Sequence, residues 1–246
     1  MSSITKIIQN IIWINMYWIV FDLKYITRIG HEVGAKVGFD LAHATGNVVL
    51  KLHDWGVDFA VWCHYKYLNS GPGSIAGAFV HDKHLHNPNI PRFEGWWGHD
   101  KKTRFLMGDT FHPMPSAESW QLSNAPVFSM TPLLASLELF DAVGMDKLNE
   151  KSILMTAYME FLLLEIDSDR IHIITPTNPK DRGCQLSIQV KNGNKDLFDA
   201  ITARGVIADW REPDVIRVAP VPLYNSYTDV YLFIEILSDC LNKSLH

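Results

Sequence analysis

The first half of the chain combines one helical pattern with short apolar runs that end in polar residues. Apolar residues recur at helical spacing between residues 21 and 34, and Gly34 is suited to end the helix. A helix that leads into strands with polar side chains at their ends is typical of an α/β fold, in which ligands bind beyond the carboxyl ends of the strands. Three runs are typical of buried strands: 35–40, 58–63 and 75–81.

The second half predicts a separate α+β unit. Residues 88–126 are rich in Gly, Pro, Trp and charge, and we expect long functional loops there. Residues 131–166 have a helical pattern that we expect to break near Val143 and Gly144 into two helices. The rest of the chain alternates strand-like with helical segments: strands at 171–176, 184–190 and 215–220, and helices at 194–205 and 227–241.

Residues 1–20 form an apolar leader that differs from the rest of the chain. Gln9, Asn10 and Asn15 interrupt it, whereas a membrane span needs about 20 mostly apolar residues. No small-residue cleavage site of a signal peptide is obvious. We therefore expect a buried strand or helix, or a segment that does not belong to the fold.

Composition narrows the class of protein. The chain has 246 residues, of which 47% are hydrophobic and 20% charged, as in an ordinary globular protein of one or two domains. A formal net charge of -5 argues against a nucleic-acid partner. The three cysteines, Cys63, Cys184 and Cys240, are far apart and form no C-x-x-C motif, which fits a reducing cytosol.

Lys66 stands in a setting that is unusual for a lysine. It lies between Tyr65 and Tyr67, close to Trp62, in a turn between two predicted apolar strands. A solvated surface lysine, the alternative, needs no such neighbours. An apolar setting favours the uncharged amine, which is the form that attacks an aldehyde.

Asp40 and His43 follow the end of the preceding predicted strand, and Lys66 comes 26 residues after Asp40. Alone, the pair fits a helix N-cap and a surface histidine. An acid at one strand end and a lysine one strand later are also what pyridoxal phosphate (PLP) requires, because the acid keeps the pyridine nitrogen protonated and the lysine holds the aldehyde. The glycines Gly71 and Gly73 permit a tight turn after the lysine.

The segment "HDKHLH", His81–His86, has three histidines whose spacing admits a zinc site. A polar surface turn after a strand is the alternative. No cysteine or clear fourth ligand is nearby, so the surface turn is favoured.

Arg217 and three loop residues also admit two interpretations each. Arg217 has apolar neighbours in a predicted strand, and a buried arginine serves either in an internal salt bridge or as a clamp on a substrate carboxylate. Trp96, Trp97 and Asn124 lie in predicted loops, where tryptophan serves in ligand binding or in core packing.

Together these segments resemble kynureninase, a PLP enzyme of the aspartate aminotransferase type (fold type I). The resemblance implies an α/β fold in which 21–145 are part of a large PLP-binding domain with a parallel-type sheet, and 146–246 are a small α+β domain. The matching stretches are "GFDLAHATGNV", "LHDWGVDFAVWCHYKYLNSGPGSIAGAFVHDKH", "GWWGHD", "LSNAP", "RGCQLSI" and "IRVAPVPLYNS".

The resemblance implies a cofactor role for five residues. Lys66 would hold the aldehyde of PLP, and Asp40 would pair with the pyridine nitrogen. His43 would lie beside the cofactor and orient it. Tyr65 and Trp96 would reach the phosphate. "HDKHLH" matches a family segment that binds no metal, so the resemblance implies no metal site.

The implied reaction is hydrolysis of the Cβ–Cγ bond of L-kynurenine or 3-hydroxykynurenine, which gives anthranilate or 3-hydroxyanthranilate and L-alanine in tryptophan catabolism and NAD biosynthesis. Lys66 and Tyr65 would act as acid and base. Asn124 would contact the cofactor or the substrate, and Arg217 would hold the substrate carboxylate. The family implies a cytoplasmic homodimer without nucleic-acid or membrane partners.

The chain departs from the family at its N-terminus. Kynureninases are much longer there, and the additional half carries a phosphate-binding loop and the aromatic residue that stacks on the pyridine ring. Residues 1–20 do not match the family. We therefore keep two hypotheses: a kynureninase, and a truncated, non-catalytic kynureninase fragment. Another PLP enzyme of the same fold type, such as a cysteine desulfurase, is disfavoured by "GWWGHD" and "IRVAPVPLYNS".

Overall fold

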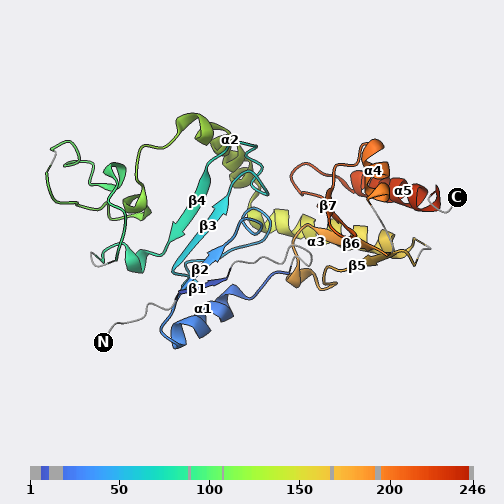
Figure 1. Ribbon diagram of the computed structural model, residues 1–246, viewed down its shortest axis with the longest axis horizontal. Helices are drawn as coiled ribbons and strands as arrows, with labels where there is room; N and C mark the ends of the chain where they lie inside the picture. Colours follow the sequence, from blue (N-terminus) through green and yellow to red (C-terminus); the bar gives the residue numbers. More distant parts are fainter. Residues whose placement is uncertain are drawn as a thin grey trace. The chain divides into compact units, whose positions relative to one another are not determined.

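The computed structural model describes residues 7–10, 19–87, 90–106, 108–166, 169–191 and 195–243. The chain forms two compact units (Figure 1). Unit 1 comprises the described parts of Met1–Ile12, Asp22–Gly46 and Leu50–Leu139, and unit 2 those of Trp13–Phe21, Asn47–Val49 and Phe140–His246.

Unit 1 is built on a four-stranded sheet in the order β1-β2-β3-β4. β1 and β3 both pair parallel with β2, and β4 pairs antiparallel with β3. The parallel part follows the expected pattern, whereas the antiparallel edge strand was not foreseen. The strands are β1 (Ile7–Asn10), β2 (Lys36–Asp40), β3 (Phe59–Cys63) and β4 (Ala76–Val80).

The helix predicted over 21–34 is α1 (Leu23–Glu32). The Asp22 side chain caps it by accepting a hydrogen bond from the Tyr25 backbone at 2.8 Å, which satisfies one of the free N–H groups of the first turn. Val37 and Phe39 of β2 are fully buried, and together with Ala60 of β3 they form part of the core of this unit.

Residues 7–10 of the apolar leader form β1 and so belong to the sheet. Ile19 and Val20 are described outside any regular element, and the other residues of the leader lie outside the described part of the chain.

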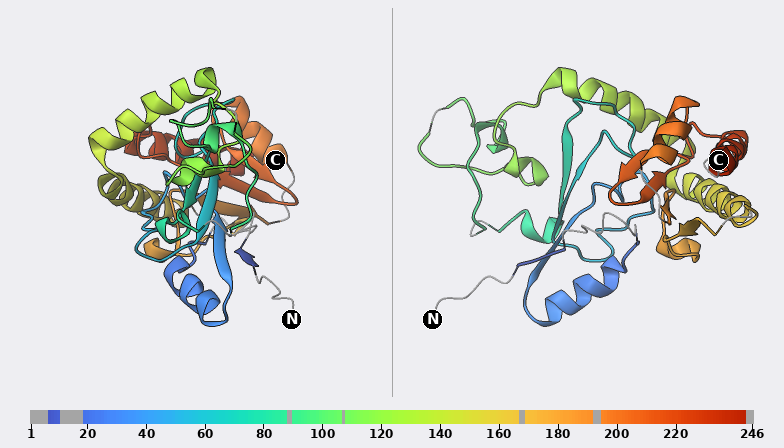
Figure 2. Two further views of the ribbon diagram at one scale, coloured as in Figure 1. Left: turned by 90° about the vertical axis from the view of Figure 1, so that its left-hand side faces the viewer. Right: turned by 45° about the vertical axis from the view of Figure 1, so that its right-hand side comes forward.

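Between β4 and α2 the described residues form three short 3₁₀ helices joined by irregular backbone, as predicted for loops at 88–126. Figures 1 and 2 show this segment, in green, extending away from the sheet on the side of β4. The short helices are η1 (Asp82–His84), η2 (Trp96–Gly98) and η3 (Ala117–Trp120).

The two helices expected within 131–166 are α2 (Val127–Val143) and α3 (Met145–Leu164), and they are separated at Gly144 as predicted. No single helix among the described residues is long and apolar enough to cross a membrane, although α2 and α3 taken together as a bent pair meet the criterion of length and composition.

Unit 2 packs helices on an antiparallel sheet in the order β5-β6-β8-β7. α3 and α5 lie against each other, and Met155 and Leu237 from these helices are fully buried with Ile188 and Ile216 of the sheet. The strands are β5 (Ile171–Ile173), β6 (Leu186–Val190), β7 (Asp209–Arg211) and β8 (Val215–Val218); η4 (Pro179–Asp181), α4 (Asp196–Ala203) and α5 (Tyr227–Lys243) complete the unit.

Candidate active site

The candidate site begins where two parallel strands of unit 1 end. Asp40 is the last residue of β2, and its backbone is in register with Val61 of β3. The Asp40 carboxylate accepts a hydrogen bond from the Ala42 backbone at 2.9 Å, which turns the chain sharply after the strand. This turn carries His43 toward the loop that follows β3.

Lys66 lies in that loop, between β3 and β4, as the sequence predicted. Its Nζ is 2.8 Å from His43 Nε2. An ammonium group only donates hydrogen bonds, so His43 accepts here with an unprotonated Nε2. The edge of the His43 ring faces Tyr67, with 6.2 Å between the ring centroids. The structure thus brings together the histidine and the lysine that the sequence singled out, and Asp40 precedes this histidine in the turn after β2.

The setting of Lys66 is more open than the sequence indicated. Lys66 is half-buried rather than buried, and Tyr65 is 52% exposed. The Tyr65 ring still flanks the amine, with its centroid 5.8 Å from Nζ. A hydrogen bond with Cys63, together with the electrostatic interaction between the two groups, raises the pKa of the Tyr65 phenol. Tyr65 is therefore a protonated hydrogen-bond donor at neutral pH.

Gly46 allows the two loops to approach closely. Its φ is +82°, and a Cβ built on it would lie 2.7 Å from the Tyr67 carbonyl oxygen, which is closer than Cβ atoms are found. Only glycine therefore fits where the turn after Asp40 packs on the loop that carries Lys66.

Buried polar atoms around these loops are left for a further partner. Thr45 Oγ1, Asn69 Nδ2, Ser70 Oγ and Ser74 Oγ are buried and have no hydrogen-bond partner among the described residues. Buried polar atoms are normally paired, so these atoms mark a place where a polar ligand or water completes the structure. An amine, a carboxylate, two aromatic rings and unpaired hydroxyl and amide groups fit the aldehyde, ring nitrogen and phosphate of PLP.

Trp96 and Asn124 lie in the loops of unit 1 and contact their own neighbours. Trp96 is in η2, and its Nε1 donates to the Arg104 carbonyl at 3.2 Å. Asn124 is exposed, and its Oδ1 accepts from Ser123 Oγ at 3.1 Å. Their binding roles stay predictions.

Arg217 is in β8 of unit 2, where it is buried and forms an ion pair with Asp209 of β7. This ion pair is the internal salt bridge that was one of the two interpretations of Arg217 from the sequence. A role in holding the substrate carboxylate stays a prediction.

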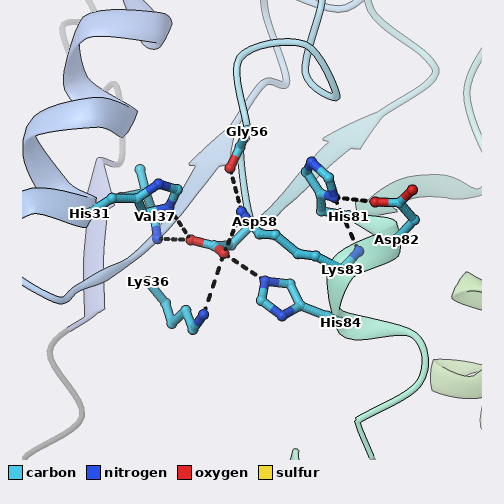
Figure 3. Close-up of polar contacts among 9 residues, drawn as sticks. All are labelled: His31, Lys36, Val37, Gly56, Asp58, His81, Asp82, Lys83 and His84. Atoms are coloured by element: carbon cyan, nitrogen blue, oxygen red, sulfur yellow. Dashed lines mark hydrogen bonds and ion pairs between the residues drawn. The ribbon is translucent and has the colours of Figure 1, made fainter.

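The histidines of "HDKHLH" separate in the structure. His84 Nε2 binds Asp58 at 2.6 Å, and His81 pairs with Asp82 (Figure 3). His86 is exposed. The zinc site with three histidines from this segment, which the sequence disfavoured, is not the arrangement that forms.

Asp58 is a buried carboxylate that the sequence reasoning missed. Burial by itself raises its pKa, but the hydrogen bonds that it accepts outweigh burial and hold the pKa of Asp58 well below its usual range. An acid at the start of an apolar strand was the available signal. Four groups donate to it (Figure 3): Val37 N at 2.7 Å, His31 Nε2 at 2.8 Å, His84 Nε2 at 2.6 Å and Lys83 Nζ at 3.0 Å.

Known structures share this fold. A cysteine desulfurase, CsdA from Escherichia coli, superposes with a TM-score of 0.77 at 15% identity, covering 96% of this chain and 59% of that one. A variant of C-DES with glycine covalently linked to the PLP cofactor superposes with a TM-score of 0.75 at 17% identity, covering 95% and 60%. At this identity the likeness shows the fold alone, that of PLP-dependent fold type I proteins.

Sequence comparison points to one family. Residues 148–237 match the model of the kynureninase C-terminal domain. The chain is 56% identical over 221 residues to a kynureninase of Flavobacterium psychrophilum, covering 89% of this chain and 52% of that protein. It is 55% identical over 217 residues to a kynureninase of Myxococcus xanthus, covering 88% and 51%. The chain is thus similar to kynureninases over most of its own length, spans about half the length of these curated relatives, and matches the family's C-terminal domain in its second half.

Proposed function

We propose that this chain carries the lysine-bearing half of a kynureninase, a hydrolase that cleaves the Cβ–Cγ bond of L-kynurenine or 3-hydroxykynurenine with PLP as cofactor. The observation that carries the proposal is the contact of Lys66 Nζ with His43 Nε2 at 2.8 Å, beside Asp40 at the carboxyl end of β2. The identity of about 55% to kynureninases supports the same function.

The residues of unit 1 have distinct tasks in holding PLP. Lys66 offers a primary amine to the aldehyde, and Asp40 offers a carboxylate to the pyridine nitrogen. Tyr65 and Trp96 offer an O–H and an N–H to the phosphate. When bound, PLP withdraws electrons from the substrate and stabilises negative charge at its Cα.

Lys66, His43 and Tyr65 are the residues that we propose to move protons. The Lys66 amine would serve as the base for the substrate Cα, and His43 Nε2 accepts a hydrogen bond from that amine. The raised pKa of Tyr65 keeps its phenol protonated, so that it donates a proton when the carbon–carbon bond breaks. Water supplies the oxygen that adds to the γ-carbonyl carbon.

Arg217 and Asn124 are the proposed substrate-binding residues. A guanidinium group matches a carboxylate in a bidentate manner, and Asp209 already occupies the Arg217 side chain with such a group. The substrate carboxylate would thus compete with Asp209 or share the arginine with it. We further propose a cytoplasmic homodimer for the whole protein.

A truncated, non-catalytic fragment is the second candidate. Apolar side chains on the part of α2 that belongs to unit 1 are unusually exposed, with Phe128 at 93% and Val127 at 71%. Exposed apolar surface of this kind favours association or aggregation. The chain also spans only about half of its curated relatives.

Reconstitution with PLP tests the proposal. The purified chain is mixed with PLP, its visible absorbance is recorded, and the complex is reduced with borohydride and mapped by peptide mass spectrometry. We expect a visible band and a label on Lys66, which Lys66→Ala abolishes and Lys102→Ala, at an exposed loop position, retains. Release of anthranilate from kynurenine, followed by fluorescence, then separates the two candidates. A label spread over several lysines would contradict the proposed site.

A further inference from the structure

Three metal-ligating side chains of unit 1 gather at the end of the sheet away from Lys66. His53 precedes β3, and His81 and Asp82 directly follow β4. One ligand atom from each of the three lies within 4.8 Å of the others. His53 and Asp82 are exposed, so an ion from solvent reaches them.

The distance between His53 and Asp82 is close to that between two ligands of one ion. His53 Nε2 lies 3.4 Å from Asp82 Oδ2. Ligands bound to zinc at about 2.0–2.1 Å in a tetrahedron are about 3.3 Å apart. His81 Nδ1 lies 2.6 Å from the other carboxylate oxygen, Oδ1 (Figure 3). Each oxygen of Asp82 thus faces an imidazole nitrogen.

His81 Nδ1 and Asp82 Oδ1 face each other, and both are hydrogen-bond acceptors. The Lys83 backbone donates to His81 Nδ1 at 3.2 Å, which assigns a lone pair to that nitrogen. Asp82 Oδ1 is an acceptor as well, because a carboxylate oxygen only accepts hydrogen bonds. Two acceptors 2.6 Å apart repel each other unless a proton or another cation lies between them.

One ligand of the cluster is already held in place. The His53 and His81 rings are stacked, with centroids 4.6 Å apart and planes inclined by 25°, so the exposed His53 ring would turn for both nitrogens to face one ion. The His81 side chain is only 12% exposed, and its backbone donates to the Asp58 carbonyl at 3.0 Å. A ligand that is already held in place loses little conformational freedom on binding.

The ammonium group of Lys83, next to Asp82 in η1, contacts groups other than Asp82. Lys83 Nζ donates to the Gly56 carbonyl at 2.6 Å and forms an ion pair with Asp58 at 3.0 Å (Figure 3). It is thus directed to a different carboxylate and leaves Asp82 to the two histidines.

We propose that His53, His81 and Asp82 bind a divalent transition-metal ion, with zinc as the natural ligand. Two imidazoles and a carboxylate are a donor set that zinc, cobalt and nickel share. Water completes the coordination. The ion would connect the segment before β3 with η1. The same short helix carries His84 and Lys83, which contact Asp58. This site shares His81 and Asp82, but neither His84 nor His86, with the "HDKHLH" segment and is independent of the proposed PLP chemistry.

Cobalt titration of the purified full chain tests the proposal, because tetrahedral cobalt gives intense visible bands. We expect one equivalent of Co²⁺ to bind and Zn²⁺ to displace it. His53→Ala and Asp82→Asn each remove one of three ligands and should weaken binding at least about tenfold. His86→Ala, at an exposed histidine outside the cluster, is the matched control and should bind as the unchanged chain does.

Thermal unfolding with zinc provides a second measurement. Zinc should raise the Tm of the unchanged chain and of His86→Ala but not of Asp82→Asn, because only an ion bound to the folded state stabilises it. Circular dichroism without metal checks that each variant is folded. Absence of cobalt binding at millimolar concentration would overturn the proposal. Equal affinity in His53→Ala, Asp82→Asn and the unchanged chain would show an adventitious ion only and would overturn it as well.

Discussion

Lys66 Nζ and His43 Nε2 lie 2.8 Å apart, although 23 positions separate the two residues in the chain. The contact joins the turn after β2 to the loop after β3, so the geometry of the lysine depends on both loops. Because His43 accepts this hydrogen bond, it both orients the amine and takes up part of its charge.

His43→Ala should weaken PLP binding by about tenfold to a hundredfold, because a hydrogen bond to a charged group contributes about 1.5–3 kcal/mol. His43→Gln retains an acceptor and should recover part of the loss. The measurement is titration of the visible absorbance with PLP. His86→Ala is the control, and equal binding by His43→Ala would contradict the role of His43.

Gly46→Ala should destabilise unit 1 by more than Gly71→Ala. Both glycines have positive φ, which costs other residues about 1–2 kcal/mol, but only at Gly46 would a Cβ collide with backbone, at 2.7 Å from the Tyr67 oxygen. Around Gly71 nothing lies within 4 Å. Urea unfolding measures the difference, and equal losses would show that the two loops do not pack as described.

Asp58→Asn should lower the free energy of unfolding by about 3–5 kcal/mol, as expected when one member of a buried ion pair is removed and the other charges stay. The imidazoles and the ammonium group around it would face a neutral amide. Asp54→Asn, at an exposed position just before β3, is the control and should change stability by less than about 0.5 kcal/mol. Urea unfolding at pH 7 is the measurement.

The free energy of unfolding should fall at acid pH because of Asp58. The folded-state pKa of Asp58 is held below its ordinary value of 3.8, so its contribution is present above that pH and is lost as the pH falls through and below it. Asp58→Asn should flatten this part of the profile of unfolding free energy against pH. An unchanged slope between about pH 5 and pH 3 would show that other carboxylates set the acid limit.

Iodoacetamide should modify Cys63 before Cys184. Burial raises the pKa of the Cys184 thiol to about 12, which leaves almost no thiolate at pH 8, whereas Cys63 is half-buried at the end of β3. Peptide mass spectrometry after timed alkylation distinguishes the two sites. In urea both should react at similar rates, which serves as the control for intrinsic reactivity.

The sequence predicted the elements whose pattern is strong and local. The strands around Lys66 are apolar runs bounded by polar residues, and the break between α2 and α3 coincides with Gly144. β7 was missed because Asp209, Trp210 and Arg211 have neither length nor alternation of apolar side chains; its pairing with β8 is a tertiary effect.

The clusters that arise from contacts far apart in the chain were harder to foresee. Asp40 and Lys66 were predicted to share a site because consecutive strands end at one edge of the sheet. His53 and His81 meet only because β4 turns back antiparallel to β3, and no local pattern of residues indicates that direction. The exposure of Tyr65 likewise depends on what surrounds the loop, which a local pattern does not encode.

Because β4 runs antiparallel to β3, the two ends of the sheet carry different groups of side chains. Five residues of β3, about 17 Å of extended chain, separate Asp58 at its start from the loop of Lys66 beyond its end. The end where β3 begins holds the ion pairs of Asp58 and the proposed metal site. The end where β3 stops holds the groups that would meet a cofactor. Substitutions that strengthen or weaken the contacts of Asp58 can thus accumulate at a distance from the Lys66 amine. The stability of the chain and the reactivity of the lysine can therefore be varied independently.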